Sequence, residues 1–506
     1  MSLTFSQAEP KINSVSKGRI AFDNSYARLP ERFYEHIAPT PVPAPHLIKL
    51  NEDLAKTLGL DPEFLKGAEG VSILAGNAVA EGSTPIAQAY AGHQFGNFVP
   101  QLGDGRAVLV GEVVAPSGER FDIQLKGSGQ TRFSRQGDGR AALGPVIREY
   151  VVSEAMAALG IPTTRSLAAV LSGERVQRER ILPGGVLTRV ASSHLRVGTF
   201  EYFAARHDIE GLRTLADYAT QRHYPEAANA ADPYMAFFEA VIARLAQLAA
   251  HWMQIGFIHG VLNTDNTSIA GETIDYGPCA FIDAYHPRKV FSSIDHHGRY
   301  AYENQPGIVQ WNLACLAECL LPLFAGDKDE VTARANEALA RFVTIYHAAY
   351  LKGFRRKLGL FEAQEGDKQL IGDLLTCMAE NSADLTLTFR ALSDAAENVA
   401  NNEKARALFL NPAAYDVWAI KWRERLSREG QSEQERSAMM RAINPKFIPR
   451  NHRVEAAIAA AEQGRFEPFE ELVQVLARPC VDQPAFEHYA APPLPEEEVT
   501  QTFCGT

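Results

Sequence analysis

One apolar stripe, between Asp232 and Gly256, constrains the fold of this 506-residue chain more than any other feature. Asp232-Pro233 has the residue types favoured at a helix N-cap and first position, and Gly256 is a typical helix stop. Large apolar residues recur between them at helical spacing: Tyr234, Phe237, Phe238, Val241, Ile242, Leu245, Leu248, Trp252 and Met253. The sequence therefore predicts a core helix over 233–256 that delivers the chain rigidly into the next loop.

That loop, residues 259–278, carries the residue types of a metal–nucleotide site. It places Asp265-Asn266 on one turn and Asp275, in Asp-Tyr-Gly-Pro, on the next. In protein kinases a His-Arg-Asp-Leu-x-x-x-Asn loop and an Asp-Phe-Gly turn supply the amide and the carboxylate that hold nucleotide-bound Mg²⁺. His259, Leu262 and Asn266 match the first pattern, and Asp275 begins the second.

One departure from the kinase pattern decides its interpretation. The position of the catalytic Asp holds Val261, and Asp265 stands beside the metal-binding amide instead. A loop with this metal pair and a displaced base should handle a nucleotide differently from a kinase. The alternative is that these polar residues merely cap turns, but both halves of the pattern follow a strongly amphipathic helix.

A second group of candidates lies upstream, in residues 101–149. Alternating and apolar runs predict strands on both sides of a turn, and Lys126 closes the second strand as the Lys of Val-Ala-Ile-Lys does in kinases. Glu149, in a helix predicted from Pro145, is the acid best placed to pair with Lys126. The segment between them is rich in glycine and arginine, a composition suited to wrapping a polyphosphate.

Further strands are predicted over 166–171 and 185–190. Arg189 and Arg196 follow as candidates to clamp a terminal phosphate, although surface arginines would explain them equally well. Beyond residue 330 the chain predicts a succession of amphipathic helices to about residue 480 and then an extended acidic tail.

Composition excludes several function classes. The net charge of −11 argues against general nucleic-acid binding, which demands a basic face. Apolar runs stay below the ~18 residues of a membrane span, and the start has no secretory signal pattern. Six cysteines in a chain of this length are not a disulfide framework, and no His or Cys group has zinc-site spacing. We expect a cytoplasmic protein.

Several long motifs occur in an order that resembles the selenoprotein O (SelO) family of protein adenylyltransferases. They are residues 22–30 (FDNSYARLP), 91–96 (AGHQFG), 100–106 (PQLGDGR), 123–129 (IQLKGSG), 132–135 (RFSR), 259–266 (HGVLNTDN) and 444–451 (NPKFIPRN). The resemblance implies an α+β, protein-kinase-like fold of two lobes, a mixed β-rich N-lobe and a mainly helical C-lobe with a C-terminal helical extension. The expected units are an N-terminal wrap (1–85), the N-lobe (86–200), the C-lobe (201–330) and the extension with its tail (331–506).

The resemblance also implies an activity, transfer of AMP from ATP to Ser, Thr or Tyr hydroxyls of proteins with release of pyrophosphate. ATP would bind in the reverse of its kinase orientation. Asp265 would accept the proton of the incoming hydroxyl, and Asn266 and Asp275 would bind Mg²⁺ or Mn²⁺. The implied nucleotide-binding residues are Gly103, Gly105, Arg106, Lys126 held by Glu149, Asp138, Gly139, Arg189, Arg196 and Asp275.

Alternatives to this function remain open at the level of sequence. UTP can replace ATP as the donor in some bacterial members of the family. A γ-phosphoryl-transferring kinase and a non-catalytic ATP-binding scaffold are the rival functions, against which Val261 and the intact metal pair respectively argue. We expect a monomer whose partners are ATP and protein substrates, without nucleic acid or membrane. The resemblance implies a mitochondrial rather than a cytoplasmic location if the source is eukaryotic.

The cysteines depart from the family pattern. Members typically carry a loop cysteine that can pair with a tail cysteine, but the matching loop position here is Phe291. The tail partner, Cys504, is present, and Cys279 is the nearby candidate to pair with it. Redox control through these two residues is a hypothesis.

Overall fold

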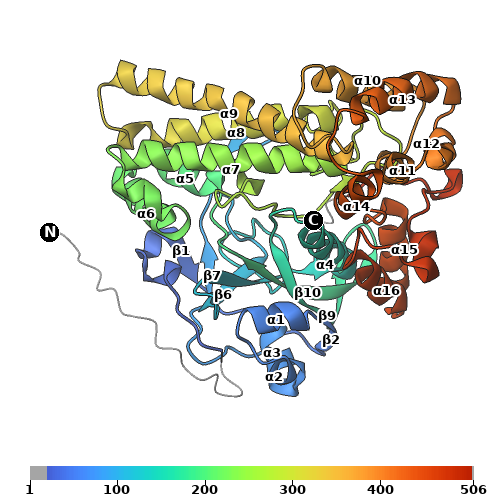
Figure 1. Ribbon diagram of the computed structural model, residues 1–506. Helices are drawn as coiled ribbons and strands as arrows, with labels where there is room; N and C mark the ends of the chain where they lie inside the picture. Colours follow the sequence, from blue (N-terminus) through green and yellow to red (C-terminus); the bar gives the residue numbers. More distant parts are fainter. Residues whose placement is uncertain (1–19, 504–506) are drawn as a thin grey trace.

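The computed structural model describes residues 20–503, in which a β-sheet region from the first part of the chain packs against a larger helical region (Figure 1). Mixed α and β structure agrees with the predicted α+β class. Among the described residues no helix is both long and apolar enough to cross a membrane.

The main sheet is antiparallel and has eight strands in the order β1-β3-β6-β7-β10-β9-β2, with β8 paired to β10. Their bounds are β1 Tyr34–His36, β2 His46–Leu50, β3 Ile86–Gln88, β6 Ala107–Val114, β7 Arg120–Lys126, β8 Ala141–Ala142, β9 Arg165–Gln177 and β10 Ile181–Ala191. The strands predicted within 101–126, 166–171 and 185–190 are confirmed, and β9 and β10 extend well beyond the predicted residues. The centre of the sheet, where Lys126 lies opposite Leu187, is buried.

The first 85 residues contribute to this sheet as well as covering it. Strands β1 and β2 lie at its two ends, and one face carries α1 (Glu52–Thr57), α2 (Pro62–Lys66) and α3 (Ala68–Leu74). Helix α1 begins after Asn51, whose side chain caps it by accepting from the Leu54 amide at 3.1 Å.

The predicted core helix is α7, Pro233–Ile255, and it runs through the largest hydrophobic cluster. Asp232 accepts from the Met235 amide at its start, and Gly256 ends it with a left-handed φ of 72°. Its neighbours are α5 (Val197–Ala204), α6 (Ile209–His223), α8 (Gln305–Leu320) and α9 (Lys328–Lys357). Figure 1 shows α7, α8 and α9 side by side as a layer above the sheet region.

The remaining helices run almost to the end of the chain, as predicted. They are α10 (Asp367–Glu380), α11 (Leu385–Glu397), α12 (Asn402–Arg406), α13 (Pro412–Leu426), α14 (Glu433–Ile443), α15 (Asn451–Ala461) and α16 (Glu467–Leu476). The last two return to the sheet region, where they pack on α4 (Leu143–Ala158) in a shared apolar cluster. Helix α4 begins at Leu143, two residues before Pro145. Proline is tolerated there because N–H groups in the first turn of a helix have no intrahelical partner.

The tail after α16 differs from the extended segment that was predicted, because it includes a 3₁₀ turn at Pro495–Glu497. It then reaches the loop that follows the turn at Asp275. The Thr502 amide donates to the Phe291 carbonyl at 2.7 Å, and the Ser293 amide donates back to the Thr502 carbonyl at 3.0 Å.

Candidate active site

A cavity of about 660 Å³ between the sheet and the loop after α7 brings the predicted site residues together. Gly103, Gly105, Arg106, Lys126, Asp138, Gly139, Arg189, Arg196, Asp265, Asn266 and Asp275 all line it. Glu149 does not line the cavity but contacts Lys126 from α4. Residues separated by more than 170 positions therefore meet in one place.

Lys126, at the end of β7, is held between two carboxylates. Its Nζ lies 2.5 Å from Glu149 Oε2 and 2.5 Å from Asp275 Oδ1. The predicted Lys126–Glu149 pair is thus present. Through its second ion pair, the same ammonium links strand β7 to the turn at Asp275. Arg189 lies 3.3 Å from the other oxygen of Glu149 and donates to Gln124 on the neighbouring strand.

Asp275 and Asn266 offer oxygen atoms to the same cavity. Asp275 adopts a left-handed φ of 67°, unusual for a residue other than glycine. Burial raises the pKa of its carboxyl, but the positive charges of Lys126, Arg106 and Arg189 outweigh burial and hold that pKa well below its usual range. The Asn266 amide nitrogen donates to the Val261 carbonyl at 2.9 Å, which fixes the side chain and leaves its oxygen available.

Asp265 is the buried acid of the site. Burial raises the pKa of its carboxyl to about 6, although the positive charge of Arg196 opposes the shift. Its Oδ2 accepts a long hydrogen bond, 3.4 Å, from Gln94, and its buried Oδ1 has no hydrogen-bond partner. Oδ1 lies against Gly92, where an added Cβ would be 2.7 Å away, and Oδ2 has only its weak bond to Gln94. A weakly bonded carboxylate that lines a polar cavity can accept a proton.

Arg196 is positioned by aromatic and acidic neighbours rather than lying on the surface. Its guanidinium stacks over the Tyr90 ring at 4.2 Å and lies 3.6 Å from Asp104, a buried carboxylate. Asp104 in turn accepts from the Gln88 amide and from Gln124 at 3.1 Å each.

The outer part of the cavity is formed by the glycine- and arginine-rich segment. Asp138 there pairs with Arg178 at 2.8 Å, and its Oδ1 accepts from the Arg140 amide at 2.9 Å. Gly139 has a left-handed φ of 67° and an added Cβ would lie 2.1 Å from the Gly129 backbone, so the turn requires glycine.

A hairpin that the sequence left unassigned holds the loop that contains Asp265 and Asn266. Strands β4 (Gly92–Gln94) and β5 (Asn97–Val99) cross residues 263–266. The His93 amide donates to Thr264 Oγ1 at 2.7 Å, and Thr264 donates to Glu201 on α5 at 2.6 Å. The Phe95 amide donates to Asn263 at 3.0 Å. The glycine-spaced motif at 91–96 was a signal for this hairpin, but its contacts depend on the fold.

The same place contains a group of possible metal ligands that sequence spacing did not reveal. Donor atoms of His93, Glu201 and Cys315 lie within 4.8 Å of one another. The His93 Nδ1 to Glu201 distance is 2.5 Å, a direct hydrogen bond, and Glu201 also accepts from Thr264. These bonds satisfy the buried carboxylate, so the group is explained as a support of the catalytic loop.

Of the two cysteines in the redox hypothesis, the structure describes Cys279. Cys279 is a buried free thiol, and burial raises its pKa to about 12. Cys504 lies outside the described residues. The tail approaches Cys279 closely, because the Thr502 hydroxyl donates to the Pro278 carbonyl at 2.6 Å.

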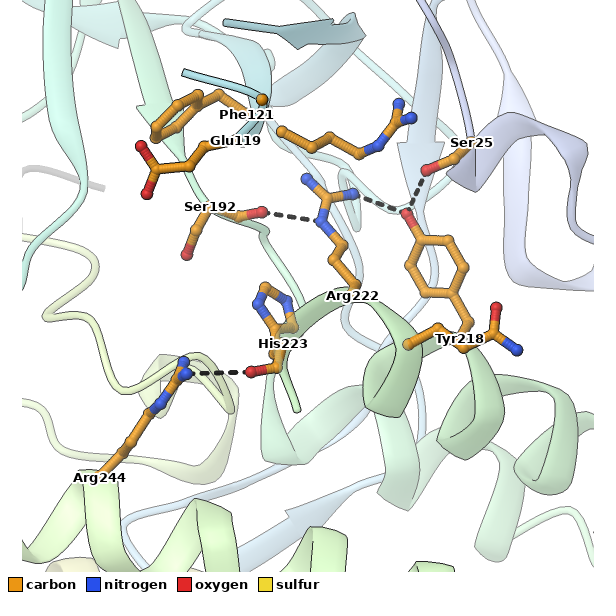
Figure 2. Close-up of a pocket in the computed structure, with 11 residues that line it drawn as sticks. Ser25, Glu119, Phe121, Ser192, Tyr218, Arg222, His223 and Arg244 are labelled. Atoms are coloured by element: carbon orange, nitrogen blue, oxygen red, sulfur yellow. Dashed lines mark hydrogen bonds between the residues drawn. The ribbon is translucent and has the colours of Figure 1, made fainter. Parts of the chain in front are cut away.

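A second cavity, of about 500 Å³, lies between β7 and α6 and is rich in arginine (Figure 2). Arg222 is neutralised there: it lies 2.9 Å from Glu112 and 2.6 Å from Asp122, and donates to the Ser192 carbonyl at 2.8 Å. Figure 2 shows Arg244 turned to the His223 carbonyl. Because its buried arginine is already paired, this cavity ties α6 to the sheet rather than presenting a free anion site.

Comparisons with known proteins identify the family of this chain. The family model described as "Protein adenylyltransferase SelO" matches residues 18–477. A relative from Nitrobacter winogradskyi is 66% identical over 487 residues, 96% of each chain. Relatives from Rhodopseudomonas palustris (strain BisB18) and Bradyrhizobium diazoefficiens are 62% and 61% identical over 486 residues, 96% of this chain and 99% of theirs. All three are called protein nucleotidyltransferase YdiU.

These matches first define the class, an enzyme of the nucleotidyltransferase type. Because the family model spans most of the sequence, the chain belongs to the SelO family of protein adenylyltransferases. The family expected from the sequence motifs is therefore confirmed.

Proposed function

We propose that this chain transfers AMP from ATP to a Ser, Thr or Tyr hydroxyl of a protein substrate and releases pyrophosphate. The observation that carries the proposal is Asp265, a buried and weakly hydrogen-bonded carboxylate that lines the same cavity as the Lys126–Asp275 ion pair. A proton acceptor and a set of phosphate-binding cations are the two components that such a transfer needs.

In the proposed step, the hydroxyl oxygen forms a bond to the α-phosphorus of ATP as the bond to the β-phosphate oxygen breaks. The hydroxyl proton goes to Asp265, and the electron pair leaves with pyrophosphate. Lys126, Arg189 and Arg196 would neutralise the charge on the leaving group. Their side chains are held in place by Glu149, Gln124 and Tyr90 before any nucleotide binds, so little reorganisation is needed.

Asn266 and Asp275 would hold the divalent metal. They fit the role because Asn266 presents an amide oxygen while its nitrogen is bonded, and Asp275 is kept ionised by neighbouring positive charges. When bound, Mg²⁺ or Mn²⁺ supplies charge neutralisation on the phosphates. The choice between these metals, and between ATP and UTP, stays a prediction.

Three further features belong to the proposal. The sheet region and the helical region would correspond to the two lobes of a kinase-like fold, with boundaries near residues 85, 200 and 330. ATP would bind in reverse orientation, with its leaving phosphates toward Lys126. A monomer located in the cytoplasm is the predicted state.

The experiment incubates the protein with a mixture of candidate substrate proteins and with ATP. One reaction contains ATP labelled at the α-phosphate, and a parallel reaction contains ATP labelled at the γ-phosphate. We expect the α-label on protein and the γ-label in pyrophosphate. Label from the γ-position on protein would identify a kinase instead, and tight ATP binding without labelled protein would identify a scaffold. The Asn266→Ala variant should lose transfer while its unfolding temperature stays close to that of the parent.

A further inference from the structure

A third cavity, of about 540 Å³, adjoins the candidate active site. Phe95 and Ile294 line both cavities, so the two are adjacent. Ile294 is half exposed at 51%, which gives the groove an apolar edge open to solvent. We refer to this cavity as the 294–308 groove.

The wall of the groove is attached directly to the catalytic loop. Tyr300, at the end of the segment 292–300, donates its hydroxyl to Asn263 at 2.5 Å. The Phe95 amide donates to the same Asn263 oxygen at 3.0 Å. Because Asn263 lies two residues before Asp265, the groove has a fixed position relative to the proton acceptor.

Arg299 lies in this groove with its guanidinium already oriented. The guanidinium carbon is 4.8 Å from the centroid of the Trp311 ring. The same carbon would be 3.6 Å from a Cβ added at Gly96, so the group also lies close to the backbone of the hairpin. An arginine stacked in this way loses little entropy when it binds a planar carboxylate.

Neighbouring acids do not neutralise Arg299. Its buried Nε has no hydrogen-bond partner, and within residues 20–503 its guanidinium makes no ion pair. The adjacent acid, Asp295, is engaged elsewhere: it accepts from the backbone amides of Arg299 at 2.9 Å and Tyr300 at 2.8 Å. The exposed His296 and His297 add no negative charge to the groove.

We propose that the 294–308 groove binds an extended segment of the protein substrate, and that Arg299 binds an Asp or Glu side chain close in sequence to the acceptor hydroxyl. This inference rests on the proposed function, because it assigns the polypeptide that brings the hydroxyl to Asp265. The apolar edge at Phe95 and Ile294 contacts the segment between the two anchored side chains. Arg299 thus selects acidic acceptor sequences.

The test uses short synthetic peptides with a central Tyr in an alanine–glycine background. One Glu is moved through the flanking positions, and each peptide is matched by the same peptide with Gln. Binding is measured by fluorescence anisotropy in the presence of an ATP analogue that cannot be cleaved between the α- and β-phosphates. At one position we expect Glu to bind about tenfold more tightly than Gln, as a charge-assisted bidentate bond implies.

Variants of Arg299 distinguish a specific contact in the groove from nonspecific electrostatic attraction between the peptide and the protein. Arg299→Gln should reduce the Glu/Gln ratio to about one, and Arg299→Lys should leave an intermediate ratio because it keeps the charge without the fork. Arg288→Gln, an exposed arginine of the same loop that does not line the groove, should keep the full preference. Equal binding of Glu and Gln peptides at every position, or a preference that survives in Arg299→Gln, would overturn the inference.

The same peptides distinguish this inference from the proposed function. Transfer of the α-label is measured in parallel with intact ATP. A Glu preference in binding without any label transfer would refute the proposed function and leave the groove as a peptide site. Label transfer with equal use of Glu and Gln peptides would refute the groove and support the function.

Discussion

At the scale of single residues, Asp265 combines an unfavourable environment with a proposed role as proton acceptor. Its carboxyl is almost fully buried and has an oxygen without a partner, an arrangement that stabilises nothing in the resting protein. Active sites often retain such costly groups because they are needed during the reaction. Removing the charge should therefore separate activity from stability.

We predict that Asp265→Asn lowers AMP transfer by a factor of about 10²–10⁴, because the isosteric amide cannot accept a proton. Nucleotide affinity should stay within about twofold of the parent, as followed with a fluorescent ATP analogue. Asp53→Asn, which removes an exposed carboxylate of α1, is the control and should transfer AMP at the parent rate. Full activity in Asp265→Asn would exclude Asp265 as the proton acceptor.

The same variant should be more stable than the parent above pH 6. Burial raises the pKa of Asp265 from 3.8 to about 6, so ionisation is unfavourable in the folded state. A shift of this size lowers the free energy of unfolding of the parent by about 3 kcal/mol. The loss is fully present above the pKa of the folded state and disappears as the pH falls below about 4. Urea unfolding at pH 8 and pH 4 measures it, and an equal difference at both values would contradict this origin.

The residues that the sequence predicts for the site lie together in the structure where spacing determines the geometry. The Asp265-Asn266 and Asp275 turns could be identified because the chain between them is short, and the Lys126–Glu149 pair followed from a strand end facing a helix start. Asp104 and Tyr90, which orient Arg196, had no such signal. Their role depends on a contact between separate parts of the fold, which no local pattern encodes.

At the scale of elements, the β4–β5 hairpin fixes the position of the loop that contains Asn263, Thr264 and Asp265. Residues 89–96 could not be assigned from sequence, since three-residue strands with glycine have no measurable periodicity. The structure brings them against a loop 171 positions later in the chain, through the His93–Thr264 hydrogen bond. Helix α7, in contrast, was predictable because its long apolar stripe is a strong local signal.

Gly92 allows this hairpin to approach Asp265. A Cβ added at Gly92 would lie 2.7 Å from Asp265 Oδ1 and 2.9 Å from its Cβ, closer than atoms can pack. We predict that Gly92→Ala displaces the carboxylate and lowers AMP transfer by about tenfold or more, since small misplacements of catalytic groups are costly. Transfer of the α-label and ATP affinity, measured together, should show a loss in kcat.

Gly372→Ala is the matched control for this substitution. Gly372 lies inside α10, and an added Cβ there meets no atom within 4 Å. Alanine should raise the stability of that helix by up to about 1 kcal/mol and leave transfer unchanged. If Gly92→Ala were equally active, the close approach of the hairpin would have no part in positioning Asp265.

At the scale of the whole molecule, the C-terminal helices connect the two regions of the fold. Helices α15 and α16 pack on α4, whose Glu149 holds Lys126, while Asn451 bonds the backbone of Phe281 near the metal-site turn. The helical character of this part could be predicted from sequence. Its return to the sheet could not, because amphipathic periodicity shows that a helix has a buried face without showing what covers it.

Arg450 is the residue through which this connection can be tested. It is fully buried and its guanidinium contacts Asp283, Asp384 at 2.7 Å and the Ala490 carbonyl at 2.9 Å. Replacement by Met would leave two carboxylates without their cation. We predict that Arg450→Met lowers the free energy of unfolding by about 3–5 kcal/mol at pH 7, as expected when one partner of a buried ion pair is removed.

The measurement is urea unfolding of the full chain, combined with hydrogen exchange of α4 and α15. Protection should fall in both helices, because losing the anchor of α15 also uncovers the apolar face of α4. Arg453→Met is the control, since Arg453 is partly exposed and donates to a single carbonyl, that of His488. A loss confined to α15, with α4 as protected as in the parent, would show that the C-terminal helices cover the sheet region without stabilising it.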